Sequence, residues 1–267
     1  MSLEKVVKVR LGRNRLLIPA SRVVLFYEVW VMDVYGNLNI TEGDVVLDLG
    51  ANVGDFTIVA SKKAGEKGIV VAVEPNPYYY SLLLENIRIN KLQNVIPLNL
   101  AITDLEGTVT MDRDHLVESE KIQSSSDLFC AKSTSIDNLL SDLSIPKADI
   151  MKMDIEGTEA IAFRNQKFLN HLREFSVEIH SKESFDRLIP YFVDNGFSFE
   201  TSSRTMMHQR LMQSILNHPF SLFYSEIKMK FKGTRKYLLY LFKRSELLVS
   251  DGISSEMTVV RAYKPNP

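Results

Sequence analysis

The sequence has very little cysteine, no long apolar run and almost no excess of either charge. Cys130 is the one cysteine in 267 residues, which excludes an internal disulfide and a cysteine-rich zinc site and is typical of a reducing compartment. No run reaches the roughly 18 apolar residues of a membrane span, and the first residues lack the apolar core of a signal peptide. The net charge of -1 argues against an electrostatic nucleic-acid binder. We therefore expect a cytoplasmic protein with one sizeable domain and insertions.

Two common phosphate-binding motifs are also missing. The sequence has no G-x-x-x-x-G-K-[ST] loop, and the G-x-G-x-x-G pattern fails because Asn52 and Asp55 occupy its second and third glycine positions. The stretch Val45–Gly54 instead has an apolar run, an aspartate and a Gly-x-x-x-Gly turn. This pattern predicts a buried parallel strand, a tight turn and a helix that begins at Gly54 or Asp55. Gly50 and Gly54 are expected to let the backbone pass close to a ligand.

Acidic residues end two successive predicted strands. Asp48 lies at the end of the first, and Glu74 follows the second, Ile69–Val73. An aspartate there repels a pyrophosphate but suits a ligand with an ammonium and a sulfonium, and an acid at the second position can accept both ribose hydroxyls. The pair therefore predicts S-adenosylmethionine as the cofactor. Each residue alone also has a structural explanation, namely helix capping for Asp48 and a solvated loop carboxylate for Glu74.

Strands and helices alternate through most of the chain. A mostly parallel sheet with helices on both faces follows from this order. A hairpin is predicted over 6–19 and a short helix over 23–35, and the serine-rich stretch 114–132 is predicted to be a long loop. The further elements are strands at 94–100, 107–112 (the return arm of a hairpin), 148–153, 174–179, 197–200 and 257–263. Helices are expected at 77–90, at 136–140, from after Glu159 to about Asn170, and at 182–195.

The candidate catalytic residues follow two later strands. Asp154 and Glu156 stand at the end of one, where open α/β sheets bind ligands, and His180 ends the next. His180 is the natural general base because its ordinary pKa of about 6.5 suits proton uptake near neutrality. The two carboxylates can orient the His180 ring or bind hydroxyl groups of the substrate. A divalent ion held by all three ranks below direct base catalysis because no further ligand is evident, so no metal is predicted.

Four stretches carry a resemblance to a known family. Val45–Gly54 resembles the first motif of class I S-adenosylmethionine-dependent methyltransferases, and Glu74-Pro75-Asn76 resembles their acidic second-strand end. Ser135–Leu139, followed by Met151–Glu159 with its Asp-Ile-Glu-Gly-x-Glu pattern, resembles the FkbM family of methyltransferases. The resemblance covers roughly residues 25 to 200 and the terminal strand.

The resemblance implies a Rossmann-like sheet of seven strands, the last antiparallel, and an enzyme that O-methylates a sugar, glycolipid or other small-molecule hydroxyl. N-methyl acceptors stay open. Asp154, Glu156 and His180 would face the acceptor. The cofactor would lie against Asp48, Gly50, Ala51, Asn52, Gly54, Glu74 and Ala101, where the small Ala101 leaves room for adenine or simply packs tightly.

Residues 204–250 form a basic, aromatic-rich segment that interrupts the predicted methyltransferase domain. The segment has nine Lys and Arg residues against two Glu residues. Such a helical insertion can contact an anionic membrane surface, a lipid-linked glycan or a second copy, or simply present a solvated basic face. The predicted organisation is an N-terminal cover at 1–40, a methyltransferase domain at 41–203 and 251–267, and this insertion.

Two alternative functions remain at the sequence level. The first is a nucleic-acid methyltransferase that grips phosphates with the basic insertion. The sequence argues against it, because Asp154-Ile155-Glu156-Gly157 stands where a base-flipping Asn-Pro-Pro-Tyr-like motif would lie. The second is a module that keeps the cofactor fold but has lost catalysis. The intact pair of Asp48 and Glu74 argues against this alternative, because an inactive relative would have no use for it.

Overall fold

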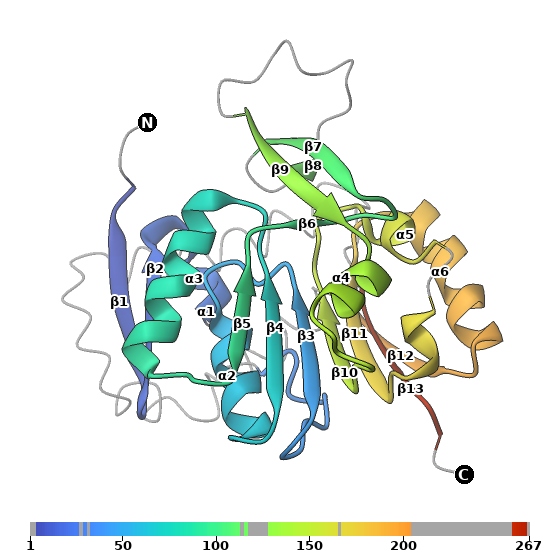
Figure 1. The fold of residues 1–267 in the computed structure, drawn as a ribbon, viewed down its shortest axis with the longest axis horizontal. Helices are drawn as coiled ribbons and strands as arrows, with labels where there is room; N and C mark the ends of the chain where they lie inside the picture. The colour runs from blue at the N-terminus through green and yellow to red at the C-terminus, as the bar shows by residue number, and fades with distance from the viewer. Residues whose placement is uncertain are drawn as a thin grey trace.

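The central feature of the fold is a seven-stranded sheet (Figure 1). The computed structural model describes residues 4–26, 29–30, 33–112, 115–116, 128–164, 167–203 and 258–265. In spatial order the strands are β12 (Ser198–Ser203), β13 (Thr258–Tyr263), β11 (Glu174–Ile179), β10 (Ile150–Met153), β3 (Val45–Leu49), β4 (Ile69–Val73) and β5 (Val95–Leu98). The strands from β11 to β5 are parallel, and β13 is antiparallel to both of its neighbours. The predicted sheet, with its antiparallel last strand, is confirmed.

Helices cover both faces of this sheet, as its two-sided apolar strands require. On one face Leu47, Met151 and Phe175 pack in a core with α4, α5 and α6. On the other face Val46 and Ile150 pack in a core with α2 and the N-terminal hairpin. The helices are α1 (Val23–Phe26), α2 (Asp55–Ala64), α3 (Pro77–Asn90), α4 (Ile136–Asp142), α5 (Glu159–Ala162) and α6 (Lys182–Asp194), with short 3-10 turns η1 (Ala20–Arg22) and η4 (Phe168–Asn170).

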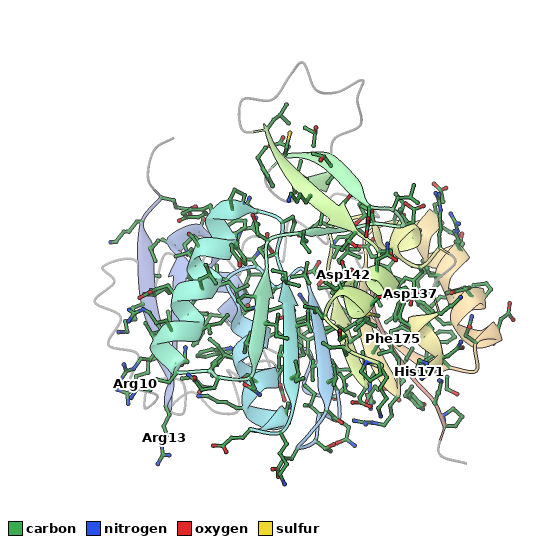
Figure 2. All side chains as sticks on the ribbon, in the orientation of Figure 1. Arg10, Arg13, Asp137, Asp142, His171 and Phe175 are labelled. Atoms are coloured by element: carbon green, nitrogen blue, oxygen red, sulfur yellow. The ribbon has the colours of Figure 1, made fainter. Side chains whose placement is uncertain are left out.

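The N-terminal hairpin consists of β1 (Val6–Leu11) and β2 (Asn14–Pro19), and the predicted hairpin is therefore confirmed. Arg13, at its turn, points away from the protein (Figure 2). Two asparagines of α3, one turn apart, satisfy the edge of β2. Asn86 accepts from the Leu17 amide and donates to the Leu17 carbonyl, and Asn90 does the same for Arg15. The hairpin is thereby attached to the domain through hydrogen bonds between these asparagine side chains and its backbone.

A second, four-stranded sheet corrects the predicted loop at 114–132. Its order is β6 (Ala101–Ile102), β9 (Leu128–Thr134), β7 (Gly107–Asp112) and β8 (His115–Leu116), and it lies beyond the carboxyl ends of the central strands (Figure 1). The partner of β7 was wrongly predicted, because β9 lies between β6 and β7. The strand β9 was not predicted because the polar, serine-rich composition of this stretch is typical of a loop. Its formation depends on pairing with β7, which is a tertiary contact.

Two predicted helices are shorter in the structure. Of the helix expected over 23–35, α1 and the π-helical residues 29–30 are helical, residues 27–28 and 31–32 lie outside the described residues, and Asp33, with φ 50°, has a left-handed conformation that a helix cannot include. The helix expected after Glu159 to about Asn170 is divided into α5 and the 3-10 turn η4. The buried residues Tyr35 and Phe163 lie in turns, so apolar content alone overestimates helix length.

The predicted insertion at 204–250, between β12 and β13, lies outside the described residues. Within the part of the chain that is described, no helix combines the length and the apolar character needed to cross a membrane.

Candidate active site

A glycine-containing turn after β3 brings the first candidate residues to the carboxyl end of the sheet. Gly50 and Gly54 have φ values of 77° and 87°, which favour glycine. A Cβ at Gly50 would lie 1.7 Å from the Asp154 carbonyl oxygen, and one at Gly54 would lie 2.6 Å from Leu83 Cδ1. Contacts within the protein therefore require glycine at both positions. From the sequence we had expected that requirement to come from the close approach of a ligand.

An open cleft lies at this edge of the sheet, and the empty space between its walls, including the part open to solvent, is about 580 Å³. It brings together six of the predicted site residues, from both the cofactor and the catalytic sets. Asp48, Ala51, Gly54 and His180 are not among its lining residues. The lining consists of Gly50, Asn52, Val73, Glu74, Pro75, Leu100, Ala101, Ile102, Met111, Asp154, Ile155, Glu156 and Thr158.

Glu74 is held firmly at the end of β4. Its two carboxylate oxygens accept hydrogen bonds from the backbone amides of Asn52 and Asn76, each at 2.8 Å. Asn76 in turn caps α3 through the Tyr78 amide. The carboxylate is therefore positioned by two successive strand-to-helix turns. Since a carboxylate oxygen accepts more than one hydrogen bond, these contacts are compatible with a ligand hydroxyl on the same group.

Asp48 lies beneath the turn instead of in the cleft. Its Oδ2 accepts a 2.5 Å hydrogen bond from Thr57 of α2, and its Oδ1 lies 3.5 Å from the ammonium of Lys152 on β10. Burial raises the pKa of Asp48. Burial opposes the charge on Lys152, but the surrounding carboxylates, Asp48 first, outweigh it and raise the pKa of the ammonium. Lys152 also donates to the Gly50 carbonyl at 2.6 Å, so this buried pair supports the floor of the cleft.

His180, directly after β11, contacts three carboxylates of the segment that follows β10. Its Nδ1 lies 2.9 Å from Glu159 Oε1, and its Nε2 lies 3.3 Å from Glu156 Oε2 and 3.7 Å from Asp154 Oδ1. Burial opposes the imidazolium, but the hydrogen bond to Glu159 and the three negative charges outweigh it and raise the pKa of His180 to about 9. The ordinary pKa of about 6.5 expected from the sequence is therefore too low, and an imidazole with a pKa of about 9 is protonated at neutral pH.

The turn after β10 has an unusual backbone at Glu156. Its φ of 55° is left-handed, a conformation that costs a residue other than glycine roughly 1–3 kcal/mol. The next residue, Gly157, also has positive φ, and its amide donates to Glu159 at 2.9 Å. Such strained positions concentrate at functional sites. The buried Glu159 therefore fixes both this turn and the His180 ring.

Two residues near the site, Lys152 and Glu178, were not predicted from the sequence. Lys152 is a lysine inside the apolar run Met151–Met153, which is itself a signal of a buried partner. Glu178 precedes His180 by two positions, so the strand period of two places both on one side of the sheet. In the structure Glu178 is buried, and Tyr35 donates to its Oε2 at 3.3 Å.

The strand order, the glycine turn and the acidic end of β4 together define the fold of class I S-adenosylmethionine-dependent methyltransferases. The chain belongs to the methyltransferase FkbM domain family, whose model matches residues 48–199. The predicted fold class and family resemblance are confirmed, and S-adenosylmethionine is the methyl donor of this class.

The chain is similar to proteins that act on different acceptors. It is 27% identical over 166 residues to the hexuronic acid methyltransferase AglP of Haloferax volcanii, across 58% of this chain and 67% of that protein. It is 44% identical over 72 residues to the tRNA(Phe) (4-demethylwyosine(37)-C(7)) aminocarboxypropyltransferase of Methanocaldococcus jannaschii, across 27% of this chain and 28% of that protein. A solved FkbM methyltransferase from Methylobacillus flagellatus has a TM-score of 0.50 at 14% identity, covering 66% of this chain and 44% of that one, which shows the fold alone.

Proposed function

We propose that this chain transfers a methyl group from S-adenosylmethionine to a hydroxyl group of a sugar or of another small polyhydroxylated acceptor. The observation that carries the proposal is the character of the cleft. Three carboxylates line it, on Glu74, Asp154 and Glu156, and no Lys or Arg is among the lining residues that the structure describes. Carboxylates accept hydrogen bonds from hydroxyl groups and repel phosphates. The similarity to AglP, a hexuronic acid methyltransferase, also supports a sugar acceptor.

In this proposal the cofactor lies at the Glu74 end of the cleft. The Glu74 carboxylate accepts hydrogen bonds from the ribose hydroxyls, and Gly50 and Asn52 line the adjoining turn. Ala101, with Leu100 and Ile102, supplies an apolar wall that suits an adenine ring. Asp48, Ala51 and Gly54 lie outside the lining, and we assign them to the shape of the turn and the support of its floor.

The acceptor lies at the Asp154 and Glu156 end. S-adenosylmethionine, when bound, supplies a methyl group activated on sulfur. The new O–C bond forms as the S–C bond breaks, the electron pair stays on sulfur, and the hydroxyl proton passes to a carboxylate of the chain. Asp154 and Glu156 both line the cleft here, and we assign this role to Glu156 because its side chain is the more exposed of the two, at 31% against 25%. His180 does not line the cleft, and we assign it to holding Asp154 and Glu156 through its Nε2.

The first test is binding, followed by a search for the acceptor. Calorimetry with S-adenosylhomocysteine is expected to show one site in the full chain. Labelled S-adenosylmethionine is then presented with glycan and glycolipid extracts, and label is expected in a sugar hydroxyl. Glu156→Gln is expected to lower kcat by about 10²–10⁴-fold while affinity for S-adenosylhomocysteine is kept. The exposed Glu66→Gln is the matched control and leaves both unchanged. Absence of cofactor binding would overturn the proposal.

A tRNA acceptor is the second candidate, favoured by the local identity to the tRNA(Phe)-modifying enzyme. The matched stretch is short, and the carboxylate-lined cleft does not suit a phosphate backbone. Bulk tRNA belongs in the same labelling experiment. Label in tRNA and none in any glycan fraction would replace the sugar proposal with this one.

A further inference from the structure

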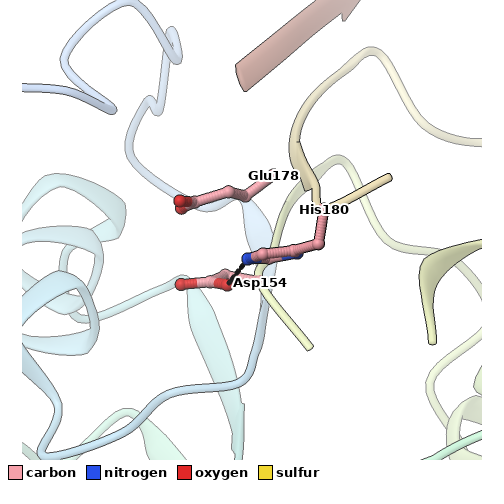
Figure 3. A group of neighbouring side chains, drawn as sticks. All are labelled: Asp154, Glu178 and His180. Atoms are coloured by element: carbon pink, nitrogen blue, oxygen red, sulfur yellow. Dashed lines mark ion pairs between the residues drawn. The ribbon is translucent and has the colours of Figure 1, made fainter. Parts of the chain in front are cut away.

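We propose that Asp154, Glu178 and His180 form a binding site for a divalent cation, Mg²⁺ or Mn²⁺, beside the acceptor end of the cleft. Figure 3 shows the three side chains projecting in the same direction from two neighbouring segments. One ligand atom from each lies within 4.8 Å of the others. An ion with bonds of about 2.1 Å holds its ligand atoms roughly 3–4 Å apart, so closure needs only a small movement of flexible side chains.

The topology places these residues together. β10 and β11 are parallel neighbours, with Met153 paired to Val177, so Asp154 and Glu178 are the next pair along the register. Glu178 and His180 are two residues apart and therefore lie on the same side of the strand. All three stand at the carboxyl ends of the strands, and Asp154 also lines the cleft, which places the ion next to a bound acceptor.

The histidine is oriented as metal-binding histidines are. Its Nδ1 contacts the carboxylate of Glu159, which is fully buried, and its Nε2 faces Asp154 and Glu156. A carboxylate on one ring nitrogen fixes the ring and leaves the other nitrogen directed at the ion. When the ion binds, Nε2 releases its proton and coordinates the ion in place of its contacts with Asp154 and Glu156. Tyr35 holds Glu178 in a comparable way through its hydroxyl.

An unsatisfied oxygen lies at the same place. Asp154 Oδ1 is buried and has no hydrogen-bond partner among the described residues, since His180 Nε2 is 3.7 Å away. A buried oxygen without a donor is costly, and a cation would satisfy it. This observation is independent of the spacing of the three ligands.

The local charge favours a cation. The carboxylates of Asp154, Glu156, Glu159 and Glu178 gather around the histidine, and the ammonium that faces this group, Lys152, is engaged with Asp48 and the Gly50 carbonyl. Two carboxylates, one imidazole and open positions for water suit Mg²⁺ or Mn²⁺ better than a thiol-seeking metal. Because this part of the inference rests on the proposed function, the ion's role would be to bind the acceptor oxygen and ease loss of its proton to Glu156.

The test measures the binding of Mn²⁺ alone to the protein. Binding is detected by electron paramagnetic resonance, because the signal of free aqueous Mn²⁺ is lost when the ion binds. The full chain is expected to bind one Mn²⁺, and Glu178→Gln and His180→Gln are each expected to weaken binding at least tenfold. Glu159→Gln is expected to weaken it by about 10–100-fold through the ring orientation. The exposed His171→Gln and Glu66→Gln are matched controls and are expected to bind as the unchanged chain does (Figure 2 labels His171).

Calorimetry with S-adenosylhomocysteine on the same variants separates this inference from the proposed function. Glu178→Gln is expected to keep full cofactor affinity, which also shows that it folds, because Glu178 does not line the cleft. No Mn²⁺ binding, or binding that Glu178→Gln and His180→Gln leave unchanged, would overturn the metal site while cofactor binding stands. In the opposite outcome, the unchanged chain binds Mn²⁺ but not S-adenosylhomocysteine, and the two variants lose Mn²⁺ binding. That result would support the metal site and overturn the proposed function.

Discussion

Replacing Lys152 with methionine tests the buried ion pair under the cleft. The Lys152 and Asp48 side chains are 6% and 0% exposed, and their charged atoms are 3.5 Å apart. At an effective dielectric constant of about 20, two unit charges at this distance attract by about 5 kcal/mol. Methionine keeps the length of the side chain but leaves the Asp48 carboxylate buried without its partner. Removing one member of a buried pair costs about 3–5 kcal/mol of unfolding free energy.

Protonation of Asp48 limits this cost and gives it a pH dependence. At about 1.4 kcal/mol per pH unit, protonating a carboxyl with an ordinary pKa of about 3.9 costs about 4 kcal/mol at pH 7 and about 1.5 kcal/mol at pH 5. In Lys152→Met the folded pKa of Asp48 lies above its unfolded value. Stability of the variant is therefore lost as pH rises, and the destabilisation is expected to shrink between pH 7 and pH 5.

Urea unfolding of the two single variants and of Asp48→Asn with Lys152→Met measures the coupling. The double variant is expected to lose only about 1–3 kcal/mol, which is the cost of leaving the Gly50 carbonyl without its donor. The two single losses should then exceed the double loss by at least about 2 kcal/mol. Additivity within about 0.5 kcal/mol, or a loss in Lys152→Met that does not change with pH, would refute the ion-pair reasoning.

Three further predictions concern the hairpin, the cofactor and acid stability. Asn86→Ala is expected to cost about 3 kcal/mol in urea unfolding because the Leu17 amide and carbonyl lose their partners, and a loss under 1 kcal/mol would contradict this. Glu74→Gln is expected to weaken S-adenosylhomocysteine binding by about 10–100-fold in calorimetry, and unchanged affinity would remove Glu74 from the ribose site. Burial opposes ionisation of Asp44, but Arg173 and backbone hydrogen bonding outweigh it and lower its pKa below 3.8. Its stabilisation is therefore present above that value and lost as pH falls further, so Asp44→Asn is expected to flatten the acid end of the unfolding curve.

The central sheet was predictable because its strands carry short-range signals. Ile69–Val73 is a buried apolar run, Glu174–Ile179 alternates polar and apolar residues, and the predicted bounds of both match the structure. The apolar start of Val45–Gly54 forms β3. The acidic ends of β3 and β4 could be found in the same way, because the carboxyl ends of parallel strands meet at one edge. The strand β9 could not, because its partner β7 is chosen by long-range pairing that a serine-rich composition does not reveal.

The environment of each candidate side chain was not predictable. Asp48 and Glu74 look equivalent in the sequence, yet one lies under the turn against Lys152 and Thr57 and the other lines the cleft. His180 has an ordinary pKa in an unfolded chain, and only the carboxylates around it in the fold raise that pKa to about 9. The charge and exposure of a side chain depend on neighbours that are distant in sequence.

The sequence alone determined the α/β architecture, the family and the edge of the sheet at which the site lies, because these follow from local periodicity and from motifs of a few residues. The tertiary structure decided which of the acids reach the cleft, why Gly50 has no side chain, and that Glu178 joins Asp154 and His180. Those outcomes depend on distances of a few ångströms between strands, and such distances exist only once the chain has packed.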